Sequence, residues 1–148
     1  MITYTTDTSA INESMLHGFF VGWPNPPSKA VHMWILAGSY LAWLAIDDAA
    51  GKVVGFINAI SDGVLSAYIP LLEVLPEYQD KGIGRELVTR MMTSLKDMYM
   101  VDVLHDENLR EYYAKFGMHS AVGSITRNYS APPLHSSTPY SSTPSSRA

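Results

Sequence analysis

The sequence predicts one mixed α/β (α+β) domain in which helices flank a mostly antiparallel central sheet. The chain has 148 residues, of which 47% are hydrophobic, and this size suits one compact core. From Tyr40 to Leu75, three apolar runs are separated by turns rich in Asp and Gly, a pattern typical of an antiparallel meander. After Pro76 the apolar residues recur at helical spacing instead. A chain that combines both patterns indicates a layered fold with helices on both sides of a sheet.

The N-terminal part is predicted to contain one short strand and two helices. The strand, Ile2 to Thr5, has alternating polarity, and Thr8 or Ser9 can cap the first helix. Glycine and proline residues then stop this helix, so Gly18 to Ser28 is a stiff loop rich in aromatic residues. The second helix is expected from about Ser28 to Ala37.

The rest of the domain is predicted to alternate strands and helices. Helical spacing of Ile83, Leu87, Val88, Met91 and Leu95 indicates an amphipathic helix that packs on the sheet. The predicted strands are 40–47, 53–61, 66–75, 100–104 and 122–129, of which 100–104 is expected to be buried. Helices are predicted at 82–99 and 109–116, which gives the order βααβββαβαβ.

The C-terminal stretch has a different composition from the domain. From Ser130 onward almost every residue is Ser, Thr, Pro or small, and such a segment cannot bury enough apolar surface to offset its ordering entropy. The sequence therefore predicts a folded domain over residues 1–129 and a disordered tail over residues 130–148.

Composition excludes several classes of site and partner. The chain contains no cysteine, so disulfides, thiolate metal sites and cysteine nucleophiles are excluded. The five histidines lack the spacing of a zinc site, so no metal is expected. The net charge is −4 and the basic residues are scattered, which argues against a nucleic-acid partner. Without a secretory signal or an apolar run as long as the roughly 18 residues of a membrane span, we expect a cytoplasmic protein with no membrane partner.

The stretch from Leu71 to Leu87 carries the strongest chemical signal. It contains an apolar strand, a short turn and then two glycines, Gly82 and Gly84, that open a helix. The first turn of a helix has free backbone amides and the positive end of the helix dipole, and glycines let a ligand approach them. An anion such as a pyrophosphate suits that place. Tight packing of the strand against the helix explains the same glycines, and the spacing alone leaves both explanations open.

Two motifs resemble the GCN5-related N-acetyltransferase superfamily. Residues 79–84, QDKGIG, are similar to the family's Q/R-x-x-G-x-G/A signature, and residues 106–118, DENLREYYAKFGM, are similar to its N-x-x-A-x-x-F-Y-x-K-x-G-F block. The resemblance extends from about Tyr40 to Met118 and keeps the family's order and separation of motifs. It implies the family's fold and an acyltransferase that uses acetyl-CoA as cosubstrate.

The resemblance also implies roles for individual residues. The strand at Leu72 to Val74 is expected to pair with the pantetheine arm, and the amides of Asp80 to Arg85 are expected to bind the pyrophosphate. Asp106 stands where the family usually has Asn, and Asn108 is close enough to replace it. The cofactor-binding residues expected on this basis are Leu72, Glu73, Val74, Gln79, Asp80, Lys81, Gly82, Ile83, Gly84, Arg85, Asp106 and Asn108.

Tyr113 and Glu73 are the candidate catalytic residues. The resemblance places Tyr113 at the tyrosine that protonates the departing CoA thiolate, and a phenol with a pKa near 10 is a suitable donor. Ordinary packing beside Tyr112 and Phe116 is the alternative. Glu73 is the only carboxylate on its strand and could deprotonate the amine, directly or through water, or hold a cationic amine. A solvated strand face is its alternative.

Aromatic residues are dense in the region where this family builds its acceptor site. Phe19, Phe20, Trp23 and Trp34 suggest an apolar or stacking pocket, although aromatic residues near prolines also form cores. They do not identify the acceptor.

The predicted function is transfer of an acetyl group from acetyl-CoA to a primary amine of a small molecule or a protein, by direct attack in a ternary complex. The alternative is a catalytically silent acyl-CoA-binding sensor on the same fold, which the Asp106 departure favours and Tyr113 disfavours. A generic α/β protein with packing glycines is a third hypothesis. The amine acceptor is the expected partner, and a homodimer is left open.

Overall fold

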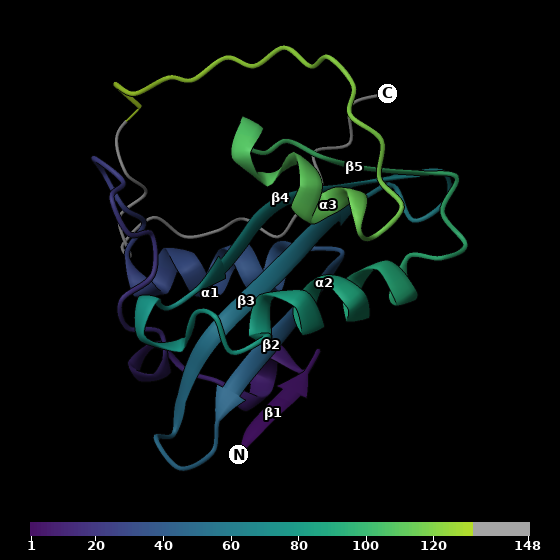
Figure 1. Cartoon of the computed structure of the whole chain (residues 1–148). Coiled ribbons are helices and arrows are strands. Elements are labelled where there is room, and N and C mark those ends of the chain that lie inside the picture. The colour runs from purple at the N-terminus through teal and green to yellow at the C-terminus, as the bar shows by residue number, and fades with distance from the viewer. Residues whose placement is uncertain (132–148) are drawn as a thin grey trace.

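A computed structural model describes residues 1–131 of the chain, so almost all of the tail predicted for residues 130–148 lies outside the described residues. The protein contains one five-stranded sheet with the order β1-β2-β3-β4-β5 (Figure 1). The first four strands are antiparallel, and β5 joins β4 in parallel. The strands are β1 (Ile2–Thr5), β2 (Leu41–Asp47), β3 (Lys52–Ser61), β4 (Ser66–Val74) and β5 (Met100–Val103), and the α-helices are α1 (Lys29–Gly38), α2 (Ile83–Ser94) and α3 (Arg110–Ala114). The mixed, mostly antiparallel fold class is thereby confirmed.

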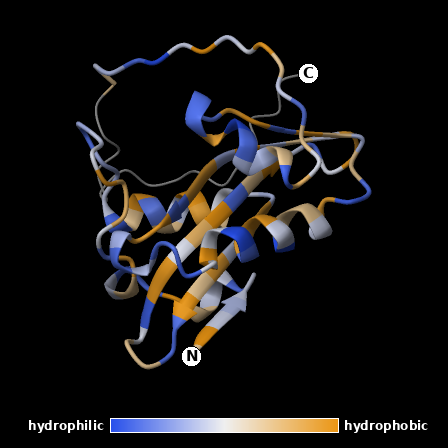
Figure 2. Cartoon of the chain, in the orientation of Figure 1, coloured by the Kyte–Doolittle hydropathy of each residue, from blue (hydrophilic) through white to orange (hydrophobic). Residues whose placement is uncertain are grey.

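The two faces of the sheet are covered by different helices (Figure 1). On one face α2 buries Ile83, Leu87 and Met91 against β3 and its neighbours. On the other face α1 and two short 3₁₀ turns pack around Phe56 of β3 and Leu44 of β2. Figure 2 shows the hydrophobic residues concentrated in these central strands. Burial of apolar surface on both faces explains why the middle strands have near-continuous hydrophobic sequences.

Gly55 of β3 lets α2 approach the sheet closely. A Cβ added at this glycine would lie 3.1 Å from a Leu87 methyl and 3.3 Å from a methyl of Ile83. Such distances are tighter than ordinary packing, so a side chain at position 55 would require the Leu87 and Ile83 side chains to shift by a few tenths of an ångström. The close packing of α2 on β3 therefore includes the space left by this glycine.

The predicted first helix is wrong, because two separate 3₁₀ turns replace it. These turns are Thr8–Ala10 and Glu13–Met15. The side chain of Asp7 accepts a hydrogen bond from the Ser9 amide, and the side chain of Asn12 accepts one from the Ser14 amide. Short polar side chains compete in this way for the backbone groups that a continuous helix would use.

The predicted last strand, 122–129, is also wrong, because residues 122–128 have no regular secondary structure and Tyr129 lies in a turn. Val122 is fully exposed and Ile125 is 62% exposed. A strand requires a partner edge for its backbone groups, and no segment of residues 1–131 pairs with this one. The strand β5 is at the sheet edge rather than buried as predicted, and Met100 is 41% exposed.

Other elements differ from the prediction only at their ends. The helix α2 stops at Ser94 instead of Tyr99, and α1 begins after its N-cap Ser28, whose side chain accepts a hydrogen bond from the Val31 amide. Among residues 1–131, every helix is too short or too polar to cross a lipid bilayer.

Candidate active site

The strands β4 and β5 separate halfway along β4. Their parallel pairing extends from Ser66 and Met100 to Ile69 and Val103, and beyond this point β4 stays paired with β3 alone within the described part of the chain. The separation coincides with a β-bulge, because three steps along β4, from Tyr68 to Leu71, face two steps along β3. Pro70 lies inside this bulge and has no amide to donate to a neighbouring strand.

Backbone groups of Leu72 and Val74 point into the gap that this separation leaves. The Leu75 amide donates a hydrogen bond to the Val54 carbonyl of β3 at 2.9 Å. Along a strand, the backbone amide and carbonyl groups of successive residues point to opposite sides. The groups of Glu73 therefore face β3 like those of Leu75, and the groups of Leu72 and Val74 face the other edge of β4. One of them is engaged already, since the Gln79 side-chain amide donates to the Val74 carbonyl at 3.0 Å. The Leu72 amide and carbonyl and the Val74 amide face the side that β5 has left.

The open edge of β4 leads directly to the N-terminus of α2. Gly82 is the N-cap residue with φ 80°, and it offers no side chain to the amides of the first turn. Asp80 also adopts a positive φ, 60°, so the turn is built from two left-handed residues. A Cβ on Gly82 would meet nothing within 4 Å in the described part of the chain, and one on Gly84 would meet its nearest atom at 3.5 Å. The glycines therefore leave free amides and open space, which suits a phosphate group.

The remaining residues of the predicted phosphate turn lie around this space. Lys81 donates to the Glu77 carbonyl at 2.8 Å and lies over the Tyr78 ring, while the Arg85 side chain is exposed. Ile83 points the other way and is buried under α2. The Gln79 side chain joins the beginning of this turn to Val74 at the end of β4.

Asp106 and Asn108, the residues expected to contact the pantetheine, lie at the surface. Both side chains are exposed in the 3₁₀ turn Glu107–Leu109 and its N-cap, and the Asp106 carbonyl accepts hydrogen bonds from the Leu109 amide and the His105 ring. Among the described residues neither side chain has a hydrogen-bond partner. They begin the segment that leads into α3.

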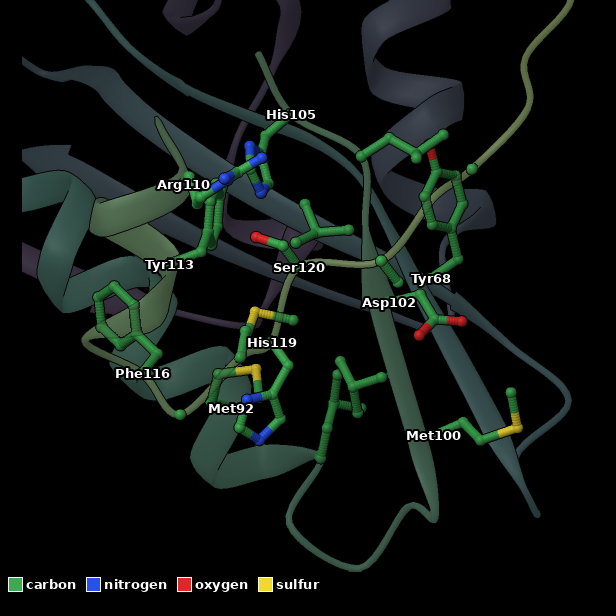
Figure 3. Close-up of a pocket in the computed structure, with 18 of the residues that line it drawn as sticks. Tyr68, Met92, Met100, Asp102, His105, Arg110, Tyr113, Phe116, His119 and Ser120 are labelled. Carbon is green, nitrogen blue, oxygen red and sulfur yellow. The ribbon is translucent and has the colours of Figure 1, made fainter. Parts of the chain in front are cut away.

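Tyr113 is buried beside the diverging end of β5. It is 6% exposed and stacks on the His105 ring, with 4.8 Å between ring centroids. Burial, with a smaller contribution from Tyr112, raises the pKa of the Tyr113 phenol to about 12. Figure 3 shows His105, Arg110, Tyr113 and Ser120 at one end of a hollow of about 880 Å³ that β5, α3 and the following segment surround. Residues of the glycine turn do not line this hollow, so it is separate from the phosphate turn.

Tyr112 is a site residue that the sequence prediction missed. Its hydroxyl lies 3.5 Å from the position that a Cβ on Gly84 would occupy, next to the Val74 side chain. Burial raises its pKa as well. The sequence did contain a sign of this, because the family motif has Phe where this chain has Tyr112, so Tyr112 adds a hydroxyl that the motif lacks.

The side chain of Glu73 lies on the face of the sheet that α1 covers, where it contacts the aromatic loop Gly18–Trp23. Its carboxylate accepts a hydrogen bond from the Phe20 amide at 2.8 Å and another from the Val21 amide at 3.2 Å. The strand register pairs Glu73 with Phe56, whose side chain lies in the core beneath α1. Glu73 is therefore not a solvated residue on a bare strand face.

The aromatic residues of the loop form a cluster around His32 and Phe56. Phe19 and Phe20 lie edge-on to the His32 ring at 5.3 and 4.9 Å, and the Trp23 ring packs on Phe20 at 5.2 Å. A cavity of about 350 Å³ adjoins the cluster, and its lining includes Leu16, Phe19, Phe20, Pro27, Lys29 and His32. Trp34 is not part of the cluster or of this lining in the described structure.

His32 is a second residue that the sequence prediction missed. It is 2% exposed, and its Nε2 has no hydrogen-bond partner among the described residues. Desolvation lowers the pKa of its imidazole to about 4, so the ring is neutral at neutral pH. Only the tertiary structure identifies it, because a histidine inside a helical pattern is equally compatible with an exposed position.

Metal binding has no candidate site in the described residues, since no group of three or more His, Asp or Glu side chains is gathered there in a suitable arrangement.

Comparison with known proteins places this geometry in a family. Residues 8–118 match the acetyltransferase (GNAT) family. A crystal structure of a proposed acetyltransferase from Deinococcus radiodurans R1 is 40% identical, covers 87% of this chain and 90% of its own, and superposes with a TM-score of 0.83. A GNAT family acetyltransferase from Streptococcus pneumoniae TIGR4 is 31% identical, with coverages of 87% and 99% and a TM-score of 0.69.

Two plant proteins are similar over shorter stretches. GCN5-related N-acetyltransferase 3, chloroplastic, of Arabidopsis thaliana is 38% identical over 79 residues, which are 51% of this chain and 33% of that protein. Serotonin N-acetyltransferase 2, chloroplastic, of Oryza sativa subsp. japonica is 30% identical over 92 residues, 61% of this chain and 44% of its own length. The chain thus spans less than half the length of these two relatives. The family match over residues 8–118, together with the separated strands and the glycine turn, shows that the chain belongs to the acetyltransferase (GNAT) family.

Proposed function

We propose that this protein transfers an acetyl group from acetyl-CoA to a primary amine, by direct attack of the amine on the thioester in a ternary complex. The observation that carries the proposal is the open edge of β4 at Leu72 and Val74, which leads into the side-chain-free N-terminus of α2. An extended arm with amide groups can pair with such a strand edge, and a pyrophosphate can accept from the helix amides. Acetyl-CoA carries both groups in this order.

The donor is held mainly by backbone groups. In this proposal the pantetheine arm bonds to the Leu72 amide and carbonyl and to the Val74 amide, and the pyrophosphate lies at Gly82 to Arg85. Because Gln79 bonds the Val74 carbonyl, it acts by fixing the turn rather than by contacting the phosphate. Asp106 and Asn108 are exposed beside α3 and are assigned no direct contact.

The acceptor is proposed to bind on the face that carries the aromatic cluster. Phe19 and Phe20 line the small cavity there, and Trp23 packs on the Phe20 ring. The Glu73 side chain extends from β4 to the Phe20 amide. An apolar wall with one nearby carboxylate suits an amine with an apolar or aromatic body. The similarity to a rice protein named for serotonin acetylation makes arylalkylamines the first small molecules to test, with peptide amines as the second class.

The chemistry forms one N–C bond and breaks one C–S bond. The neutral amine attacks the thioester carbonyl, the intermediate collapses, and the products are an N-acetyl amine and CoA thiol. The amine proton leaves to water, and the thiolate receives a proton from a tyrosine. Tyr113 is the proposed donor because its motif position matches, and Tyr112 is the alternative because its hydroxyl lies beside Gly84.

A thiol-release assay tests the proposal directly. The protein contains no cysteine, so a thiol reagent reports only the CoA that the reaction releases. Arylalkylamines, polyamines, amino sugars and peptides with free amines would be offered with acetyl-CoA, and product mass would confirm N-acetylation. Amine-dependent thiol release supports the function. Tight CoA binding in calorimetry without acetylation of any amine would instead support the sensor hypothesis, and absence of CoA binding would overturn both.

The location in the cell and the oligomeric state are also proposals. We expect a cytoplasmic location, although two relatives are named chloroplastic, and microscopy of the tagged protein would decide between the two compartments. Sedimentation analysis would decide between a monomer and a homodimer.

A further inference from the structure

The loop that borders the acceptor cavity has an unusual backbone. Gly18 and Gly22 have φ values of 87° and 78°, and between them Phe20 has a φ of 61°. Glycine adopts such values without strain, but an aromatic residue does so only when its surroundings hold it there. The conformation of this loop therefore needs an external restraint at Phe20.

Two restraints act on Phe20 from opposite ends. Its ring is 5% exposed and packs against the rings of His32 and Phe56. Its amide donates to the Glu73 carboxylate at 2.8 Å, and the next amide, of Val21, donates to the other oxygen at 3.2 Å. Hydrogen bonds to a charged acceptor are stronger than those between neutral groups, so Glu73 is the main polar anchor of the loop.

The same two hydrogen bonds bear on the role of Glu73 as a base. A proton acceptor must present a carboxylate oxygen to the amine, and here each oxygen already accepts an amide from the loop. These two hydrogen bonds fix the orientation of the carboxylate toward the backbone of Phe20 and Val21, and only the second lone pair of each oxygen stays available to an amine. Trp23, which is 50% exposed and packs on the Phe20 ring, depends on this anchor for its place beside Phe20.

We propose that Glu73 is a positioning residue that fastens the loop Gly18–Trp23 to β4 and so shapes the acceptor site, rather than the base that deprotonates the amine. The inference rests on the proposed acetyl transfer for its kinetic consequence, but its structural content does not. This role of Glu73 also explains how the donor and acceptor sites keep a fixed position relative to each other. The backbone of β4 at Leu72 and Val74 faces the donor, while the Glu73 side chain on the same strand holds the acceptor loop.

The variants Glu73→Gln and Glu73→Asp separate the two roles. Gln is isosteric, but its amide nitrogen cannot accept the second backbone hydrogen bond. Asp keeps a carboxylate, but it is one methylene too short to reach both amides. Glu13→Gln is the matched control, because Glu13 is exposed on a neighbouring turn and has no side-chain hydrogen bond among the described residues.

Amide hydrogen exchange, followed by NMR, gives a readout that does not depend on activity. If Glu73 anchors the loop, exchange of at least one of the Phe20 and Val21 amides accelerates about tenfold in each Glu73 variant, as expected for loss of one hydrogen bond to a charged group. Exchange in β3 and α2 stays unchanged, which shows that the fold is intact. Unchanged exchange at Phe20 and Val21 in folded variants would overturn the proposal, even if the enzyme acetylates amines.

Steady-state kinetics give the second readout. Anchoring predicts that the acceptor KM rises about tenfold in Glu73→Gln, while kcat stays within about threefold and CoA affinity is retained. A base predicts a fall in kcat of roughly 10² to 10⁴ in Glu73→Gln, with loss of the acidic limb of the pH profile. That second pattern would overturn the proposal. If wild-type protein acetylates no amine, the proposed function fails, and the exchange result still decides the role of Glu73.

Discussion

At the residue scale, the two neighbouring tyrosines of α3 have different surroundings. Tyr113 is buried against His105, whereas the Tyr112 hydroxyl lies beside Gly84. Since burial raises the pKa of Tyr113 to about 12, its phenol stays protonated across the pH range in which enzymes work. A proton donor must be protonated, but its catalytic value depends on proximity to the thiolate.

We expect Tyr113→Phe to lower turnover by roughly 10² to 10⁴ if Tyr113 donates the proton, with the melting temperature and CoA affinity retained. The phenol would remain a donor up to about pH 11, so its ionisation would cause no loss of turnover below that pH. Tyr112→Phe is the matched comparison and removes the hydroxyl beside Gly84. Full activity in Tyr113→Phe together with a large loss in Tyr112→Phe would transfer the role to Tyr112. Tyr113→Ala should instead cost about 3 to 5 kcal/mol of stability through its cavity.

His32 predicts a pH dependence of stability. Its folded pKa of about 4 lies below the ordinary value of 6.5, so the unfolded chain binds a proton before the folded chain does as the pH falls. The stability contributed by the neutral ring is complete above about pH 6.5 and is lost progressively as the pH falls toward 4. At pH 4.5 the free energy of unfolding should be lower by about 2 kcal/mol than at pH 7 from this group alone.

Urea denaturation at both pH values, in wild type and in His32→Phe, isolates this contribution from the other titrating groups. The variant keeps an aromatic ring in the cluster but cannot titrate. An equal loss of stability in both proteins would show that His32 is not the group responsible.

At the element scale, the start of α2 depends on two glycines for different reasons. Gly82 has a φ of 80°, so a side chain there is strained even though the surrounding space is open. Gly84 has an ordinary conformation, and a side chain there would project into the space proposed for the pyrophosphate.

We therefore expect Gly84→Val to weaken CoA binding by about 1 to 3 kcal/mol, since the side chain blocks approach to the amides. Gly82→Ala should lower the free energy of unfolding by about 1 to 2 kcal/mol from left-handed strain. Titration calorimetry and thermal unfolding of both variants separate these effects. Unchanged CoA affinity in a folded Gly84→Val protein would contradict the site.

At the scale of the whole molecule, one sheet brings the two halves of the site together. The donor edge comes from β4 and α2, and the acceptor loop comes from the segment before α1. The core beneath α1 and α2 lies within residues 1–131, and the sequence predicts that the tail adds nothing to it.

Deletion of residues 130–148 should accordingly leave the melting temperature and the turnover nearly unchanged, because a segment with so few apolar residues contributes no core. Thermal unfolding and the thiol-release assay on the shortened protein check this. A large fall in either quantity would show that the tail docks on the domain.

The sequence alone determined those features that depend on local pattern. Strands β2 to β4 follow from apolar runs between Asp and Gly turns, and α2 follows from its helical period and Gly82, because turn chemistry and periodicity act over a few residues. The motifs at 79–84 and 106–118 were sufficient to indicate the family that the comparison established.

Tertiary structure decided the features that depend on partners distant in the chain. The segment 122–129 is predicted to be a strand, but it finds no edge to pair with within residues 1–131. Which of the two tyrosines, Tyr112 or Tyr113, places its hydroxyl beside Gly84 depends on how α3 lies relative to α2, and the structure shows that it is Tyr112. Glu73 contacts the amides of Phe20 and Val21, 53 and 52 residues away, and no local pattern encodes that contact. Such contacts are fixed only when burial of both faces of the sheet brings distant segments together.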